Sequence, residues 1–380
     1  MYRRPILTLL CFSAFMGLTA VGMALYLDRS LLDPEGFLGP AFVRLPLLVL
    51  LAMLADLVPR TLWLSRFKPA AMWPIAKQRL REHWTKDRTI LTAVGVMSFY
   101  LTYVCYRNIK HFWPLLLGER KFDRELHLVD RALMLGNEPG TILHTILPWD
   151  WVAHFLSSVY LSYLPMVAIS VAIYVVWTKN LRMAYWFVIA TCLTWGIGAF
   201  AYYALPTLGP GFQYLWLYSD LPSTGASQLM YSLKQARDGV LWRGVQDAVQ
   251  SVGGFPSLHT AITLLWALMV QYTVKNRIIR WVAWSYFCIT VVATIYFGWH
   301  YIADDLGGAT IALFSFYVGG RLAGFTFDRR RTDRPVALPV GQWPPGYPDS
   351  VVLDDLHPGT AAGPRPSKPN PLGSTDAPSA

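Results

Sequence analysis

Two histidines in this sequence stand beside residue types that could carry out phosphoryl transfer. His300 is followed four residues later by Asp304, and this spacing puts both side chains on one face of a helix, one turn apart. A carboxylate in that position can accept the Nδ1 proton of the imidazole and leave Nε2 free as a nucleophile or base. Asp305 is rotated by about 100° around the helix and is the less favoured partner. His259 could protonate a leaving oxygen.

The residues around His259 are suited to bind an anion. Ser257 stands where a helix is expected to begin and is its expected N-cap. The N–H groups of the first helical turn, with Gly253 and Gly254 allowing close backbone approach, would form an anion site. A lone histidine at a helix end more often makes a structural hydrogen bond, so each half of the pattern is weak alone. Together they predict phosphoryl transfer without a metal, and we expect no cofactor because no histidine or cysteine spacing fits a metal site.

The composition places these residues in a membrane protein. Of 380 residues, 54% are apolar and only 15% are charged, and the mean hydropathy is +0.34, whereas soluble domains carry about 25% charged residues. Apolar stretches of about 20 residues can cross a bilayer. Eight such stretches occur, near 5–27, 38–58, 89–106, 150–177, 181–205, 258–274, 279–298 and 300–322. We therefore expect an all-α polytopic membrane protein with about eight transmembrane helices, six of them in a core at 89–327.

Two regions flank this predicted core. Residues 1–88 would hold two transmembrane helices followed by a basic segment at 66–88. With Trp73 and Trp84, this segment is typical of an interfacial helix on an anionic leaflet, although a solvated loop is the alternative. Residues 328–380 hold 11 of the 26 prolines, a composition that cannot bury enough apolar area to offset the entropy of ordering. We expect a disordered cytoplasmic tail there.

The distribution of positive charge predicts the orientation in the cell membrane. If eight helices alternate, the most basic connections fall on one side, and positive charge marks the cytoplasmic side. Both termini are then cytoplasmic, and the two histidines lie at the outer face. The connection at 107–149 also carries basic residues, but acidic residues alternate with them. The net charge of +10 suits anionic inner-leaflet lipids, and we expect no nucleic-acid partner.

Two of the predicted outward connections are long. In the first, Asp123 and Asp130 are spaced as on one helical face, and so are Arg124 and Arg131. This spacing predicts an amphipathic helix, which could be a lid over the site or a plain surface helix. The second connection, 206–257, is longer than connections without a function commonly are, and we expect a functional loop or a re-entrant segment.

The two histidine motifs resemble those of a known enzyme family. Pro256-Ser257-Leu258-His259, followed by the pattern His300-x-x-x-Asp304-x-x-x-Gly308, is similar to the type-2 phosphatidic acid phosphatase superfamily. Leu258 and the stretch 203–210 resemble the branch that contains fungal inositol phosphorylceramide synthase. The resemblance covers about residues 89–325 and implies a six-helix membrane core of that type. It also implies that His300 forms a phosphohistidine, that Asp304 orients it and that His259 is the general acid–base.

The sequence departs from the superfamily pattern in its cations. An arginine is usual six residues before the nucleophile, where this chain has Thr294, and the usual first motif, a lysine with a downstream Arg-Pro, is absent in clear form. Other cations must then compensate the phosphate charge. We favour Arg237 and Arg243, because arginine can hold a phosphate in a bidentate fork. Four more basic residues are further candidates: Lys234, Arg107, Lys110 and Arg131.

Several functions remain open at this point. Transfer of a phosphate-bearing, inositol-phosphate-like head group from a membrane lipid to a hydroxyl acceptor is favoured by the branch resemblance. Hydrolysis of phosphatidic acid or a polyprenyl phosphate would follow from the same intermediate if water were the acceptor. A transporter without chemistry would also suit eight helices with buried His and Asp, but no inverted repeat is visible. A haloperoxidase with bound vanadate would need the cation that is missing at Thr294.

Overall fold

The computed structural model describes residues 2–33, 40–118, 120–245, 252–327 and 337–339. Contacts divide the chain into two units, Met1–Leu338 and Pro339–Ala380. The predicted disordered tail at 328–380 lies outside the described residues except for the short strand β2 (Ala337–Pro339), which pairs with β1 (Phe325–Phe327).

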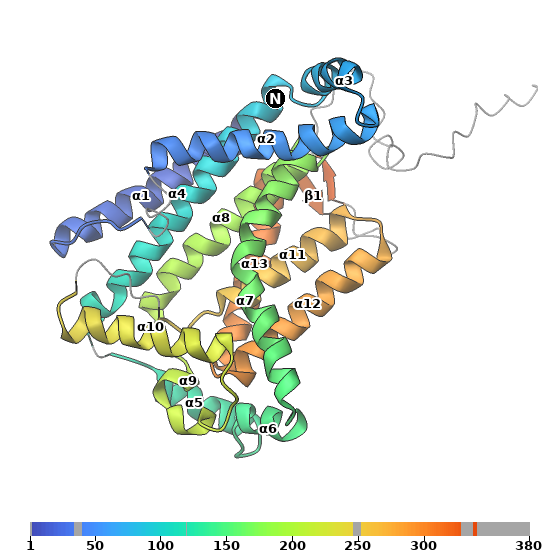
Figure 1. Ribbon diagram of the computed structural model, residues 1–380. Helices are drawn as coiled ribbons and strands as arrows, with labels where there is room; N and C mark the ends of the chain where they lie inside the picture. Colours follow the sequence, from blue (N-terminus) through green and yellow to red (C-terminus); the bar gives the residue numbers. More distant parts are fainter. Residues whose placement is uncertain (1, 34–39, 119, 246–251, 328–336, 340–380) are drawn as a thin grey trace, which may run out of the picture. The chain divides into compact units, whose positions relative to one another are not determined.

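Eight long helices account for the eight apolar stretches of the sequence (Figure 1). They are α1 (Arg3–Tyr26), α2 (Ala41–Ser65), α4 (Lys86–Leu117), α7 (Asp150–Ala172), α8 (Leu181–Ala204), α11 (Leu258–Thr273), α12 (Arg277–Tyr296) and α13 (Ile302–Leu322). At its end α7 continues into a π-helical turn, η2 (Ile173–Trp177). The prediction of an all-α polytopic membrane protein is confirmed.

Among the described residues, six helices are long and apolar enough to cross a membrane: α1, α2, α4, α7 with η2, α8 and α12. The other two long helices differ in kind. α11 has 16 residues, which span about 24 Å at 1.5 Å per residue. α13 has two acidic residues in its first turn, Asp304 and Asp305. These two helices also carry the candidate site, and ionisable groups at this depth in a membrane protein are functional candidates.

Further helices lie in the connections between the eight helices. At one end of the long helices, Figure 1 shows α5 (Asp123–Leu133), α6 (Pro139–Ile146), α9 (Pro210–Gln213) and α10 (Gly225–Trp242) gathered together. We call these four helices and the 3₁₀ turn η3 (Leu215–Tyr218) the cap. The connection at 206–257 is therefore largely helical where described. α10 begins there because Thr224 and Ser227 cap it reciprocally, with the Ser227 N–H donating to Thr224 Oγ1 at 3.3 Å.

The central helix of the core is α8. It packs against α1, α4, α11 and α13, and large side chains such as Trp186 and Tyr202 are buried along it. Close approach between neighbouring helices depends on small residues. A side chain at Gly308 of α13 would strike the backbone carbonyl of Ser257. The beginnings of α11 and α13 consequently lie in direct contact, and this contact brings the two histidine motifs together.

The end opposite the cap contains a buried cation with backbone partners. Arg88, near the start of α4, donates from Nη1 to the carbonyls of Val175 and Val176 at 3.0 and 2.9 Å, and from Nη2 to the carbonyl of Thr178 at 2.7 Å. Val175 and Val176 are near the end of η2 and Thr178 follows it. The last carbonyls of a helix lack intrahelical donors, and the guanidinium supplies them. Arg88 is therefore a structural residue.

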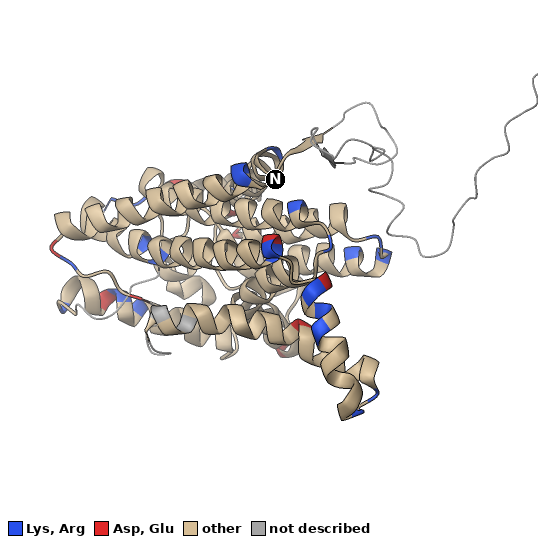
Figure 2. Ribbon diagram, turned by 90° about the horizontal axis from the view of Figure 1, so that it is seen from above, with Lys and Arg blue, Asp and Glu red and all other residues tan. Residues whose placement is uncertain are grey.

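The basic segment at 66–88 forms the helix α3 (Pro69–Glu82). Arg79 pairs with the buried Asp56 of α2 at 2.7 Å. Trp73 and Phe67 are 69% and 70% exposed, whereas Trp84 is buried and donates from Nε1 to Asp56 at 3.1 Å. Figure 2 shows that most Lys and Arg residues lie near the ends of the long helices or in the connections between them, as expected for helices that cross a membrane.

Candidate active site

His300 lies in the short connection between α12 and α13. The chain turns there at Gly298, whose φ of +71° is readily adopted only by glycine. Asp304 Oδ2 accepts the N–H of Tyr301 at 2.9 Å, and the same oxygen lies 3.4 Å from His300 Nδ1. The Asp304 carboxylate thus caps the first turn of α13 and also faces Nδ1 of the His300 imidazole. The other ring nitrogen, Nε2, consequently points away from Asp304.

His259 is the second residue of α11, and its ring is enclosed by aromatic side chains. Tyr160 stacks on it with a centroid distance of 4.2 Å, and Tyr163 lies at 4.1 Å with a tilt of 35°. These contacts fix the plane of the imidazole. The His259 and His300 ring centroids are 6.2 Å apart. Sequence reasoning missed the two tyrosines, for which the only signal was their spacing of three residues on α7.

Hydrogen bonds around Asp305 join the starts of α11 and α13 to the end of α12. Its Oδ1 accepts from Thr260 Oγ1 at 2.5 Å, and its Oδ2 accepts from Thr294 Oγ1 at 3.1 Å. Ser257 caps α11 by accepting the N–H of Thr260 at 3.4 Å, and its own N–H donates to the carbonyl of Asp304 at 2.9 Å. Thr294, where the superfamily pattern has arginine, is thus bonded to Asp305.

The glycine loop before α11 is held by Thr207. The Gly254 N–H donates to the Thr207 carbonyl and the Phe255 N–H donates to Thr207 Oγ1, both at 2.7 Å. A Cβ at Gly254 would approach Thr207 Oγ1 to 2.5 Å and Asp304 Oδ2 to 3.2 Å, so no side chain fits. The Gly254 amide, predicted to bind phosphate, has an internal partner in the structure. Thr207 is a site residue that sequence reasoning did not identify.

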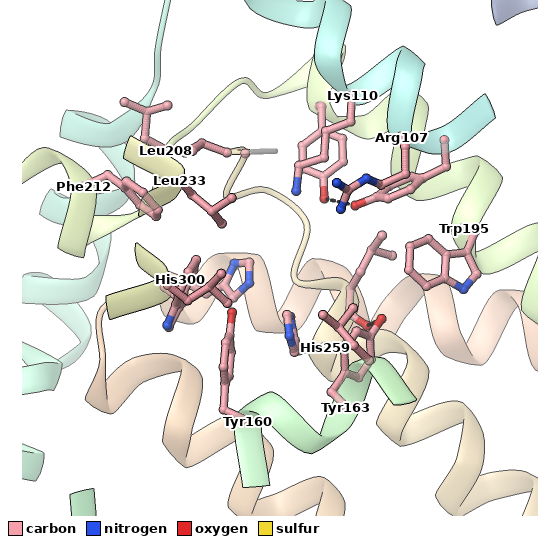
Figure 3. Close-up of a pocket in the computed structure, with 18 of the residues that line it drawn as sticks. Arg107, Lys110, Tyr160, Tyr163, Trp195, Leu208, Phe212, Leu233, His259 and His300 are labelled. Atoms are coloured by element: carbon pink, nitrogen blue, oxygen red, sulfur yellow. Dashed lines mark hydrogen bonds between the residues drawn. The ribbon is translucent and has the colours of Figure 1, made fainter. Parts of the chain in front are cut away.

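Both histidines line a cavity of about 320 Å³. Aromatic and aliphatic side chains form most of its wall, and none of the described residues that line it is acidic. The lining residues with polar groups are His259, His300, Arg107, Lys110, the tryptophans Trp195 and Trp299, and the tyrosines Tyr103, Tyr106, Tyr160, Tyr163 and Tyr202. Figure 3 shows Lys110 and Arg107 on one side of the cavity and the two histidines on the other. This distribution favours an anionic ligand.

The predicted cations are divided by the structure into two groups. Arg107 and Lys110, named as further candidates, line the cavity. The favoured Arg237 and Arg243 do not: Arg237 is buried with its guanidinium 5.0 Å from the centre of the Trp113 ring, and Arg243 is exposed at the end of α10. Lys110 Nζ lies 4.6 Å from the centre of the Tyr202 ring, a cation–π contact that keeps the ammonium at the cavity wall.

Arg107 and Lys110 reach the cavity because α4 is longer than the sequence predicts. The apolar stretch was expected to end at 106, but α4 continues to Leu117. Tyr103, Tyr106, Arg107 and Lys110 follow the spacing of one helical face, and all four line the cavity. Arg107 and Lys110, which end the apolar stretch of the sequence, lie on the face of α4 that lines the polar cavity. The aromatic residues at the same spacing were the signal that could have revealed it.

Comparison with known protein families places this geometry in context. A family model described as the PAP2 superfamily matches residues 124–318. The chain belongs to the PAP2 superfamily. The matched region runs from α5 into α13 and contains both histidines, whereas Arg107 and Lys110 lie before it. No curated protein and no solved structure matches the chain.

Membership of the PAP2 superfamily supports a lipid phosphatase or phosphotransferase type of activity in general, without a required metal ion. The chain is a multi-pass membrane protein of that superfamily.

Proposed function

We propose that this PAP2-superfamily protein is a membrane phosphotransferase that acts on a phosphorylated lipid through a phosphohistidine at His300. The observation that carries this proposal is the 6.2 Å separation of the His259 and His300 ring centroids on the wall of one cavity. That separation leaves room for one phosphoryl group between the two imidazoles. The histidine facing Asp304 is the nucleophile, and the histidine held between tyrosines is the acid–base.

The first half of the reaction forms the intermediate. His300 Nε2 attacks the phosphorus, a P–N bond forms, and the bond from phosphorus to the lipid oxygen breaks. Protonated His259 donates its proton to that oxygen, which leaves as a lipid alcohol. Asp304 Oδ2, 3.4 Å from His300 Nδ1, stabilises the positive charge that develops on the imidazole.

The second half regenerates the enzyme. Neutral His259 takes the proton of an acceptor hydroxyl, the hydroxyl oxygen attacks phosphorus, and the P–N bond breaks. A cavity walled by tyrosine, tryptophan and leucine limits the water near the intermediate and favours a bound alcohol over water as the acceptor. We therefore favour transfer of an inositol-phosphate-like head group, whose ring would pack on the aromatic wall.

Lys110 and Arg107 are the cations proposed to compensate the phosphate charge in this reaction. Both line the cavity on the side opposite the histidines (Figure 3). Positive charges placed before the reaction stabilise the extra negative charge of the transferring phosphoryl group without reorganisation. They would take the role of the arginine that the superfamily pattern places at position 294.

The proposed orientation puts this site at the outer face of the cell membrane and both termini in the cytoplasm. Its support is the positive charge of the connections on the α3 side. There, α3 with exposed Trp73 and its basic residues would lie on anionic inner-leaflet lipids. Single cysteines introduced at exposed cap and α3 positions, labelled in intact cells with an impermeant reagent, test this arrangement. Labelling on the α3 side alone would reverse it.

A transfer assay with purified protein tests the activity. Phosphatidylinositol labelled in its head group is incubated with and without an added lipid alcohol, beside His300→Ala, His259→Ala and the control His154→Ala. His154 is exposed on α7 and does not line the cavity. We expect label to move to the lipid alcohol with wild type and His154→Ala, and not with the other two variants.

Other outcomes of this assay would favour a phosphatase or reject the phosphohistidine mechanism. Inert phosphatidylinositol with free phosphate released from phosphatidic acid or a polyprenyl phosphate, and lost in His300→Ala, would make the protein a phosphatase. Wild-type turnover in a well-folded His300→Ala or His259→Ala variant would overturn the phosphohistidine mechanism.

A further inference from the structure

The cap helix α5 carries two buried carboxylates beside the candidate nucleophile. Asp123 and Asp130 are only 2% and 3% exposed, although carboxylates are mostly found at protein surfaces. They are seven residues apart and so share one side of the helix. Neither lines the cavity. We propose that Asp123 and Asp130 are positioning residues that hold the active-site loops in the geometry in which His300 reacts, an inference that rests on the proposed function.

Asp123 joins two loops that are distant in the sequence. Its Oδ1 accepts from the N–H groups of Leu208 and Gly209 at 3.0 Å each and from the hydroxyl of Tyr301 at 3.1 Å. A Cβ at Gly209 would strike the carbonyl of Trp299, so the two loops also touch directly. One carboxylate therefore links the residue after His300 to the connection that follows α8.

Asp130 binds the backbone of Ile302, the residue that follows Tyr301. Both of its oxygens accept from the N–H of Ile302 at 3.2 Å, at the first residue of α13. Burial raises the pKa of Asp130 to about 7, and Asp304 and Glu138 act in the same direction. An apolar side chain would avoid the cost of this burial. The carboxylate, unlike an apolar side chain, accepts a hydrogen bond from the N–H of Ile302 at the start of α13, two residues after His300.

These contacts bear on the two interpretations of α5 that the sequence left open, a lid over the site and a plain surface helix. A lid has to open for substrate, whereas α5 is attached near both ends by hydrogen bonds to its two buried carboxylates. The N–H of Phe122, just before α5, also donates to the carbonyl of Pro206 at 2.9 Å. His300 is thus followed by two tethered residues, Tyr301 and Ile302. Misplacement of a reacting group by about 1 Å can cost ~100-fold in rate, so loss of a tether should lower kcat.

Variants of the full chain separate positioning from other roles. Asp130→Leu removes the acceptor, Asp130→Asn keeps an acceptor oxygen, and Tyr301→Phe removes the hydroxyl that Asp123 binds. Glu125→Gln, at an exposed position of the same helix, is the matched control. For head-group transfer we expect Asp130→Leu to lower kcat at least ~10-fold and Tyr301→Phe ~3- to 10-fold. KM should change less than about two-fold, because neither side chain contacts substrate. Asp130→Asn should stay within about three-fold of wild type, since its amide oxygen still accepts from Ile302.

The result that overturns the inference is wild-type kcat in a folded Asp130→Leu variant. A change in KM alone would also overturn it, because that would indicate direct contact with substrate. An equal loss in Asp130→Asn and Asp130→Leu would assign the effect to charge and overturn positioning by hydrogen bond. If Asp130→Leu does not fold, Tyr301→Phe decides, and its full activity would reject the inference. A wild-type protein inactive on every lipid would instead reject the proposed function, so the two failures are distinguishable.

Discussion

The two ends of α4 carry cations that differ in what surrounds them. Near the start, Arg88 is 4% exposed and donates to three backbone carbonyls. Towards the other end, Arg107 and Lys110 line a cavity together with two histidines, and no acidic residue is among the lining residues that the structure describes. The first cation completes the hydrogen bonding of a π-helical turn. The other two are placed where a phosphate could enter, so the surroundings of the charge, more than its burial, distinguish structure from function.

The buried carboxylates repeat this contrast. On the α3 side, Asp56 has an arginine partner, with Arg79 at 2.7 Å. In the cap, Asp130 accepts from a backbone N–H and lies near Asp304 and Glu138. A buried carboxylate paired with arginine can be explained by the fold, whereas one bonded only to the backbone next to other carboxylates is costly. Such a residue points to a constraint imposed by the site.

The largest effect is expected from the cavity end of α4. Lys110→Met keeps the length of the side chain and removes its charge, so transfer activity should fall by about 10²–10³-fold, as when one charge-stabilising donor is removed. Thermal stability should stay close to wild type. Steady-state kinetics on labelled phosphatidylinositol measure the effect, with Lys179→Met, at an exposed loop position, as the control. Equal activity in the two variants would end the assignment of Lys110 to phosphate.

A substitution of Arg88, at the other end of α4, should lower the stability of the fold and leave the activity unchanged. Arg88→Met removes a donor from three backbone carbonyls, of which that of Val176 also has His83 Nε2 at 2.7 Å. Leaving a buried carbonyl unsatisfied costs about 1–3 kcal/mol. We expect a lower unfolding temperature in detergent and, below that temperature, a specific activity near wild type. Arg277→Met, at an exposed position at the start of α12, is the control. A loss of activity without a loss of stability would contradict a structural role for Arg88.

The sequence was informative where a local pattern determines the geometry. The capping position of Ser257 depends on a single helical turn, and Ser257 caps α11 as expected. The four-residue spacing predicts His300 and Asp304 on one helical face; in the structure His300 lies just before α13, and Asp304 in the first turn of that helix still has Oδ2 3.4 Å from His300 Nδ1. Apolar length likewise predicted the helices. The cations could not be assigned in this way, because Arg237, Arg243, Arg107 and Lys110 are all compatible with a polar connection. Only the packing of α4 on α8 determines which of them faces the cavity, and that contact joins residues far apart in the chain.

A smaller effect is expected from the loop contact that sequence reasoning missed. Thr207→Val removes the oxygen that accepts the Phe255 N–H at 2.7 Å and preserves the shape of the side chain. The glycine loop before His259 should then shift, and kcat should fall ~10-fold. Thr61→Val is the matched control on the α3 side, since Thr61 Oγ1 is buried and has no hydrogen-bond partner among the described residues. Its activity should be unchanged. Full activity in Thr207→Val would show that the loop keeps its position without this contact.

The smallest effect concerns the pH dependence of stability in the cap. The pKa of Asp130 is raised from 3.8 to about 7, first by burial and then by Asp304 and Glu138; Tyr218 also lies near enough to interact with it. Between these values the folded protein holds a proton that the unfolded chain has released. Stability should therefore fall as pH rises from 5 to 7 and level off above 7. Asp130→Asn keeps the acceptor for Ile302 but cannot ionise, so its unfolding temperature should fall less over the same range. Unfolding temperatures of wild type and Asp130→Asn in one detergent, with Glu125→Gln as the control for a lost surface charge, measure the difference. Parallel curves for wild type and Asp130→Asn would mean that Asp130 is ionised throughout, and the charge beside Asp304 would then be part of the site at neutral pH.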